Sequence, residues 1–284
     1  MIYRGRNEFP PFHKENYRTM KQLSGEEYKK LLLEIMLKID RICRDNDFRY
    51  SIVYGTLLGA IRHKGFIPWD DDMDIAMTRE EYAKLKKYII SHPELELNVI
   101  DISDHDDTIY ACGKICDART IVKESNFRPV DGYGAFIDVF LLDNIPDDEK
   151  ERKRFKAHAR YLMKLIQHSS KMRPGKPEGL KHAFLLYGAF VYSHFFNTSR
   201  LIKKLDEYCT KYNGTETECF GVPYFLSVLK KSDFEELTDI SFEGHLLIGP
   251  KNYENVLNSI YENYRRVPPP EERTTHSVEC YWKE

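Results

Sequence analysis

The stretch between residues 48 and 77 constrains the fold most, because strand-like and helix-like segments alternate there over a short distance. FRYSIVY (48–54) is rich in β-branched and aromatic residues and ends at Gly55, which is typical of a strand followed by a turn. TLLGAIRHK then has the pattern of a short helix closed by Gly65, and MDIAM (73–77) alternates as a second strand. A strand, a turn, a helix and a strand in this order predict a sheet covered by helices.

Similar segments continue on both sides of this stretch. Ser24 and Glu27 form a capping-box pattern before apolar residues at helical spacing, which predicts an amphipathic helix over residues 25–45. REEYAKLKKYIIS (79–91) predicts another helix. We therefore expect an α+β fold in which a mixed sheet is flanked by helices. Further strands are expected at 97–102, 108–115, 119–124 and 134–142.

The character of the chain changes from Asp147 onward. A strongly basic helical pattern is followed by a break at PGKPEG and then by a largely apolar helical pattern. These features predict a helical insertion over residues 147–230, after a core that spans residues 1–146. We expect residues 231–284, with a helix through KNYENVLNSIYENY, to pack back on that core.

The insertion contains an apolar run from Ala183 to Tyr192, which is ten residues long. A helix that spans a membrane needs about 20 such residues, so this run is too short to cross a bilayer. We favour a helix buried in the protein core. Nine Lys or Arg residues between positions 150 and 173 keep a second interpretation open, in which the helix lies on an anionic lipid surface.

The overall charge and the cysteines limit the partners and the compartment. The net charge of −2 and the pI of about 6.6 argue against a nucleic-acid partner, which usually requires a basic surface. The six cysteines include no C-x-x-C pair, and the first residues lack the apolar segment of a secretory signal. We therefore expect a cytoplasmic protein, with peripheral contact to the inner face of the plasma membrane as an extension of that expectation.

An acidic cluster, DDDMD, immediately precedes the buried-looking strand residues IAM. Asp72 and Asp74 are two residues apart, so on a strand their carboxylates project to the same side, about 6.6 Å apart along the chain. Hard cations such as Mg²⁺ (or Mn²⁺) prefer carboxylate oxygens and keep substrate phosphates as their other ligands. Asp138, in the apolar run GAFIDVFLL, is the natural third carboxylate, because a charge there is costly unless it binds something.

Two other interpretations of this cluster are an EF-hand calcium loop and a solvated acidic turn. Counting from Asp70 places Asp72, Asp74 and Glu81 at positions 3, 5 and 12 of an EF-hand calcium loop. Position 6, however, would be Ile75, a β-branched residue that resists the positive φ of that turn. A plain solvated acidic turn is the other interpretation, and it would not need the buried strand or the partner in GAFIDVFLL.

Polar and basic residues precede the acidic cluster. Gly55 and Thr56 lie where the strand passes into the helix, where free N–H groups and the positive helix end favour a phosphate. Arg62, His63 and Lys64 lie at the far end of that helix, from which they would reach the same phosphate chain or neutralise the aspartates. Base and acid are therefore expected to face each other across phosphate and metal.

At the level of whole motifs, one segment resembles the signature of the LicD family, which is related to the fukutin group. This segment is YGTLLGAIRHKGFIPWDDDMDIAM. GAFIDVFLLD resembles the third-aspartate strand of that family. The tail is similar to its C-terminal block in FEG, the helix from Pro250 to Tyr264, Pro268 to Pro270, Arg273 and His276. The resemblance implies that residues 1–146 form a nucleotidyltransferase (polymerase-β-like) core.

The resemblance also implies a reaction. Members transfer a phosphorylated alcohol, typically phosphocholine, from a CDP-linked donor to a hydroxyl of a glycan or glycolipid and release CMP, as in lipopolysaccharide or teichoic acid biosynthesis. It implies that Asp72 and Asp74 hold Mg²⁺ and that Asp138 completes the site and accepts the acceptor proton. The same resemblance gives substrate-binding roles to Gly55, Thr56, Arg62, His63, Lys64, Arg273 and His276, and Trp69 and Tyr133 are the aromatic faces expected to hold choline.

Alternatives to this reaction stay open from the sequence. A true nucleotidyltransferase would use the same core and metals but pass a nucleoside monophosphate to its acceptor. A donor that carries phosphoethanolamine, ribitol phosphate or glycerol phosphate in place of phosphocholine is also compatible with the sequence. A non-catalytic lipid-surface or metal-binding protein is the alternative from another class, and it leaves the aspartates unexplained as a set.

Overall fold

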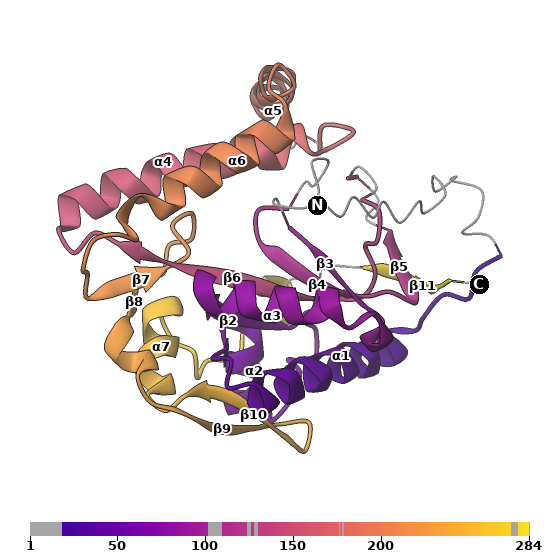
Figure 1. The fold of residues 1–284 in the computed structure, drawn as a ribbon. Helices are drawn as coiled ribbons and strands as arrows, with labels where there is room; N and C mark the ends of the chain where they lie inside the picture. The colour runs from indigo at the N-terminus through magenta and orange to yellow at the C-terminus, as the bar shows by residue number, and fades with distance from the viewer. Residues whose placement is uncertain are drawn as a thin grey trace, which may run out of the picture.

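The computed structural model describes residues 19–101, 110–123, 126–127, 130–175, 177, 179–273 and 278–283. It confirms an α+β fold with a mixed sheet, whose central strands follow the order β1-β2-β6-β4-β3 (Figure 1). β2 and β6 are parallel, whereas the other neighbours in the sheet are antiparallel. The strands of this sheet, with β7 and β8 added beyond β6, are β1 (Ser51–Ile52), β2 (Asp74–Thr78), β3 (Leu97–Ile100), β4 (Gly113–Asp117), β6 (Phe136–Ile145), β7 (Cys219–Gly221) and β8 (Leu229–Lys230).

β6 is the central strand and brings the distant aspartates together. Its register with β2 pairs Asp138 with Asp74, and the Asp138 N–H donates to the Met73 carbonyl at 3.0 Å. Neighbouring strands lie about 4.8 Å apart, so the two aspartates start side by side on adjacent strands. Ile137 and Val139, on either side of Asp138, are fully buried in the core.

Three helices come before, between and after the strands β1 and β2 in the sequence: α1 (Gly25–Asp45), α2 (Tyr54–His63) and α3 (Arg79–Ser91). The capping box of α1 is confirmed, since the side chains of Ser24 and Glu27 bond to each other's backbone N–H groups. The prediction of a strand through residue 54 was wrong, because the strand ends at Ile52 and the helix begins at Tyr54. α2 is closed by Lys64, whose left-handed backbone (φ 63°) lets its N–H reach the Gly59 carbonyl.

The insertion contains three helices, α4 (Glu149–Ser169), α5 (Leu180–Ser193) and α6 (Thr198–Cys209). α4 and α6 run side by side and share a small apolar core, whereas α5 contacts α4 but contributes no buried apolar side chain to that core (Figure 1). The prediction of a buried core helix for the apolar run was wrong, because Ser193 is the only buried residue of α5. α4 and α6 already bury their apolar stripes, so no covered face is left for α5.

The end of the chain returns to the core, as expected. The hairpin of β9 (Leu237–Phe242) and β10 (His245–Pro250) and the helix α7 (Tyr253–Ile260) contribute buried side chains to the main core. Residues 219–221 and 229–230 form β7 and β8 rather than helix, so the last α-helix of the predicted insertion ends at Cys209. The segment expected as strand 119–124 pairs outside the main sheet, because β5 (Thr120–Lys123) pairs with β11 (Glu279–Trp282). Four short 3₁₀ helices are described, at Pro93–Leu95, Thr210–Tyr212, Lys231–Phe234 and Pro270–Glu272.

Within the described residues, every helix is too short or too polar to cross a membrane.

An ion-pair network joins the insertion to the sheet. The guanidinium of Arg79 contacts both carboxylate oxygens of Asp143, at 2.6 and 2.9 Å, and also Asp206 of α6 at 2.8 Å. The Asp143 side chain is 2% exposed, and the Asn213 side-chain amide donates to it as well. A buried carboxylate that loses its cation is strongly destabilising, because the remaining charge has no compensation.

We expect Arg79→Ala to lower the free energy of unfolding by about 3 kcal/mol, because Asp143 then stays buried without its main partner. Arg41→Ala is the matched control, since the pair of Arg41 with Asp45 is exposed on both sides and is worth less than about 1 kcal/mol. Urea unfolding followed by circular dichroism measures both. Equal midpoints for the two variants would show that the Arg79 network does not support the fold.

Candidate active site

Three carboxylates converge on the bare Cα of Gly55 in the first turn of α2. A Cβ placed on Gly55 would lie 2.9 Å from Asp70 Oδ2, 3.5 Å from Asp74 Oδ2 and 3.9 Å from Asp72 Oδ1. Glycine is thus needed at position 55, because a side chain there would occupy the space of these carboxylates. Asp70 was missed by the sequence prediction of the site, although its spacing of two and four residues from Asp72 and Asp74 already placed it on the same side of an extended chain.

The start of α2 holds the start of β2. The Thr56 hydroxyl accepts the Asp74 N–H at 2.7 Å, and the Asp74 carboxylate accepts a hydrogen bond from the Gly55 backbone N–H. The Val53 N–H donates to the Asp74 carbonyl at 3.2 Å. The positive end of the helix therefore holds a carboxylate of the protein itself. Thr56 is 2% exposed and fixes Asp74, which differs from the predicted contact with phosphate.

The carboxylates repel each other where they lie. Burial and the neighbouring charges of Asp70 and Asp138 raise the pKa of Asp72 to about 8. Burial and the charge of Asp72 raise the pKa of Asp74 well above its ordinary value. Both shifts have the same physical origin, because several negative charges share a site that is poor in water. Such a cluster favours a cation.

Asp138 already has a cation beside it. The ammonium of Lys114, on β4, lies 2.6 Å from Asp138 Oδ1, and the thiol of Cys112 donates to the same oxygen at 3.3 Å. Lys114 is 5% exposed, and sequence reasoning missed it, because only the pairing of β4 with β6 places it next to Asp138. Its ammonium also faces three aromatic rings, with Nζ at 4.8 Å from the centre of Tyr110, 5.8 Å from that of Tyr133 and 3.7 Å from that of Phe136.

Two cavities meet at Asp72, which lines both. The first, of about 370 Å³, lies over α2 and under the C-terminal segment. The second, of about 460 Å³, lies between the sheet and α4. Besides Asp72, the first is lined by Gly55, Arg62, Trp69, Asp70, Asp74, Tyr261 and Arg266, among others, and the second by Tyr110, Lys114, Phe136, Asp138, Gln167, Tyr224 and Phe225.

The basic residues at the end of α2 divide into different roles. The Arg62 guanidinium lines the first cavity and donates to the Tyr264 and Arg266 carbonyls at 3.2 and 2.9 Å, so it ties the C-terminal segment over the site. His63 Nε2 accepts from Arg62 Nε, and burial together with the Arg62 charge lowers the pKa of His63. Lys64 is exposed at the helix cap and lines neither cavity, so its predicted place beside the phosphates was wrong.

The aromatic residues predicted to hold choline are already in contact with cations of the chain. The guanidinium of Arg273 lies 4.1 Å from the centre of the Trp69 ring, at the first cavity. Tyr133 is buried and faces Lys114. A bound choline would compete with these cations for the same ring faces. His276 lies outside the described residues.

The donor set suits a metal that keeps phosphate ligands. Among the residues that the structure describes, no three His, Cys, Asp or Glu side chains form a ready-made metal cage. Mg²⁺ is commonly bound by one or two carboxylates together with substrate phosphates rather than by such cages. Asp72 and Asp74 next to an open cavity fit this mode of binding, and Asp138 would join them only by exchanging Lys114 for the metal.

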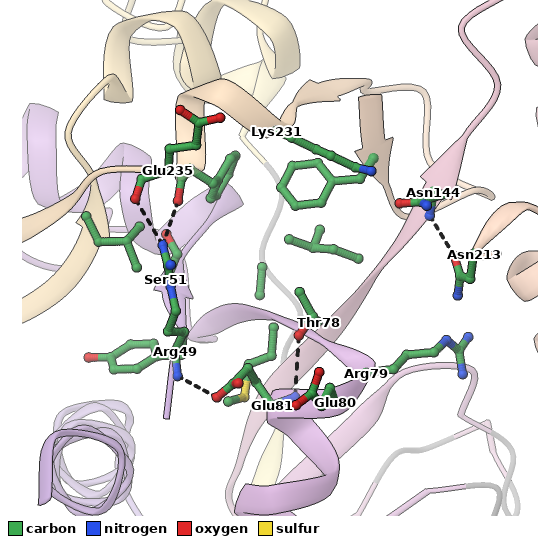
Figure 2. A pocket seen from close by; sticks show the side chains of 17 residues that line it. Arg49, Ser51, Thr78, Arg79, Glu80, Glu81, Asn144, Asn213, Lys231 and Glu235 are labelled. Atoms are coloured by element: carbon green, nitrogen blue, oxygen red, sulfur yellow. Dashed lines mark hydrogen bonds between the residues drawn. The ribbon is translucent and has the colours of Figure 1, made fainter. Parts of the chain in front are cut away.

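Another cavity, of about 640 Å³, lies at the opposite end of β2 (Figure 2). Thr78 lines it and is four residues beyond Asp74, about 13 Å along the strand. Two of its charged side chains are bonded to the backbone: the Arg49 backbone N–H donates to the Glu81 carboxylate at 2.8 Å, and the Arg49 guanidinium donates to the Glu235 backbone carbonyl at 3.0 Å. The acidic cluster is therefore the better candidate for the active site.

Residues 47–169 match the family model for the LicD/FKTN/FKRP nucleotidyltransferase domain. An α+β core with aspartates gathered at the starts of two parallel strands is compatible with that match. Residues 47–169 therefore form a domain of the LicD family. The matched residues include all four aspartates, Lys114 and the whole of the insertion helix α4.

Curated relatives extend this match. The chain is 28% identical over 272 residues to the lipopolysaccharide cholinephosphotransferase LicD of Haemophilus influenzae, which covers 92% of this chain and 98% of the relative. It is 30% identical over 135 residues to an uncharacterized protein of Rickettsia prowazekii, covering 44% of this chain and 47% of that protein. An uncharacterized protein of Rickettsia typhi is 30% identical over 143 residues, 48% of this chain and 42% of its own length.

We expect Gly55→Ala to weaken Mn²⁺ binding by roughly tenfold or more, because the new methyl group displaces the Asp70 carboxylate and disturbs its neighbours. Thermal stability should not fall, since alanine favours the helix by up to about 1 kcal/mol and the displaced group is the end of a flexible side chain. Gly188→Ala in α5, where no atom lies within 4 Å, is the control. Electron paramagnetic resonance titration and thermal melts measure the two effects, and unchanged Mn²⁺ affinity would contradict a cation site at Gly55.

Proposed function

We propose that this chain transfers a phosphorylated alcohol, most simply phosphocholine, from a CDP-linked donor to a hydroxyl of a glycan or lipid-linked glycan and releases CMP. The family match and the cholinephosphotransferase relative, aligned over 92% of the chain, support a transferase of this class. The observation that carries the proposal is Asp72, which lies between two cavities and within a cluster of carboxylates. A transfer reaction requires that a donor and an acceptor come together, and a charged side chain shared by two cavities is a place where they can meet.

In this proposal Asp72 and Asp74 hold Mg²⁺ (or Mn²⁺), with Asp138 as the third carboxylate. The metal, when bound, would neutralise the phosphates of the donor. The protein's part is to keep the carboxylates in place, through the bonds of Asp74 to Gly55 and Thr56. Lys114 keeps the charge of Asp138 compensated while no substrate is bound.

We assign the donor to the cavity over α2. Arg62 and Arg266 line this cavity, and a planar guanidinium is suited to phosphate oxygens. Its aspartates also favour the positive end of a choline head, and Trp69 and Tyr261 supply apolar faces beside them. The contact of Arg62 with the backbone at residues 264–266 would keep the C-terminal segment closed over a bound donor.

We assign the acceptor to the cavity between the sheet and α4. Aromatic rings such as Tyr224 and Phe225 give flat faces on which a sugar ring can pack, and Gln167 can bond to hydroxyl groups. Lys114 disfavours a second cation there, which argues against choline in this cavity. Because phosphoryl transfer proceeds in line, the attacking oxygen approaches the phosphorus on the side opposite to the one from which the leaving oxygen departs, as two cavities that meet at Asp72 allow.

The proposed reaction forms one bond to the phosphorus of the alcohol phosphate and breaks another. The acceptor hydroxyl gives its proton to a carboxylate, for which Asp138 is the proposed base, and its oxygen forms the new bond to the phosphorus of the alcohol phosphate. The bond from that phosphorus to the bridging oxygen breaks, and the electron pair leaves with CMP. The negative charge on CMP is stabilised by the groups that line the donor cavity.

We expect Asp72→Asn to lower CMP release from CDP-choline by roughly 10³-fold, because it removes a charge that both cavities share. Asp71→Asn is the matched control, since Asp71 is the adjacent aspartate and lines neither of these two cavities. CMP is measured with Mg²⁺ and a lipopolysaccharide acceptor. Equal turnover by Asp72→Asn and the unmodified chain would refute the proposed site.

We expect the products to separate this reaction from its rivals. Phosphocholine on the acceptor and CMP in solution support the proposal, whereas a nucleoside monophosphate on the acceptor would assign a nucleotidyltransferase. A panel of CDP-choline, CDP-ethanolamine, CDP-ribitol and CDP-glycerol, read by mass spectrometry of the acceptor, identifies the alcohol. Preference for a donor other than CDP-choline would overturn the choline assignment.

A further inference from the structure

The strongest feature outside the candidate active site is an apolar surface on α5 and the turn that follows it, here named the α5 patch. Leu180, Phe184 and Phe195 are 92%, 82% and 82% exposed, which is unusual for large apolar residues that gather in one place. The patch consists of Leu180, Phe184, Leu185, Tyr187, Val191, Tyr192, Phe195 and Phe196.

The chain around the α5 patch is strongly basic. From Arg152 to Lys204 the sequence contains thirteen Lys or Arg residues and one acidic residue, Glu178, whereas the whole chain has a net charge of −2. Lys164, Arg173 and Lys181 belong to this group and are exposed. The positive charge is therefore concentrated in the part of the chain that also carries the exposed apolar residues.

The α5 patch lies beside the C-terminal end of α4, where Lys171 and Arg173 follow the helix. α5 projects beyond the α4–α6 pair, on the far side from the β9–β10 hairpin (Figure 1). The end of α5 is tied to the end of α4, since the His194 ring contacts the Lys171 carbonyl at 3.2 Å and the hydroxyls of Tyr161 and Tyr192 are 3.5 Å apart. α5 is thus a fixed projection of α4.

We propose that the α5 patch docks the protein on an anionic lipid bilayer, with α5 lying in the interface. α5 has 14 residues, fewer than the roughly 20 needed to span a bilayer, so only interfacial insertion is open to it. Its tyrosines suit the boundary between headgroups and acyl chains. The exposed basic residues of this region, such as Lys164, Arg173 and Lys181, add electrostatic attraction to an anionic surface.

Charge selects lipid over a second copy of the chain. A symmetric dimer through the α5 patch would bring the same basic surface against itself, which is unfavourable for two like-charged faces. An anionic bilayer supplies both the apolar interior and the opposite charge. This inference does not rest on the proposed reaction, although a lipid-linked acceptor would be found at such a surface.

The test is sedimentation of the full chain with phosphatidylcholine vesicles that contain or lack phosphatidylglycerol. We expect binding to the anionic vesicles only, with affinity that falls as salt is added. The double variant Phe184→Ser with Phe195→Ser should bind at least about tenfold more weakly, because two apolar side chains no longer enter the lipid. The matched control is Ile90→Ser with Leu246→Ser, which changes two exposed apolar residues, 61% and 56% exposed, outside the α5 patch.

A second variant keeps the inference testable if the first misfolds. Tyr187→Trp places an indole in the α5 patch, and we expect its emission to shift to shorter wavelength with anionic vesicles and not with neutral ones. Absence of binding, or equal binding to neutral vesicles, would overturn the proposal. A dimer in light scattering that the Phe184→Ser with Phe195→Ser variant abolishes would assign the patch to a second copy. CMP release from a soluble acceptor, measured in parallel, reports on the proposed function separately.

Discussion

The mutual repulsion of the carboxylates that crowd around Gly55 is the constraint on which the rest of the site depends. Asp70, Asp72 and Asp74 are held around Gly55 although their charges oppose one another, as the raised pKa values of Asp72 and Asp74 indicate. Hydrogen bonds with the Thr56 hydroxyl and the Gly55 N–H hold Asp74 in place, and the pairing of β2 with β6 places Asp138 beside it. The surrounding fold keeps this unfavourable arrangement in place, and a cation together with phosphate would relieve it.

Much of the fold could be predicted because its signals are local. The capping box of α1, the helix at 79–91 and the strand that carries Asp138 follow from periodicity and turn residues over short windows. The strand pairing of Asp74 with Asp138 agrees with the expectation that the two aspartates come together. The family resemblance seen in the motifs is confirmed by the match over residues 47–169.

The rest depends on tertiary contacts that periodicity does not encode. Lys114 joins the site only because β4 pairs with β6, and Lys64 leaves it because the helix ends one residue earlier than its glycine suggested. The exposure of α5 could not be predicted from the sequence for a similar reason. An apolar run predicts burial only if some other element is available to cover it, and α4 and α6 are already packed against each other.

The two cavities at Asp72 are built from different parts of the chain. α2 and the segment around residues 261–272 line one, whereas β4, β6, α4 and the loop at 224–225 line the other. Substitutions that reshape one wall therefore need not disturb the opposite one. In a family with this architecture, preference for one substrate can drift while preference for its partner is retained, provided that the shared aspartate is kept.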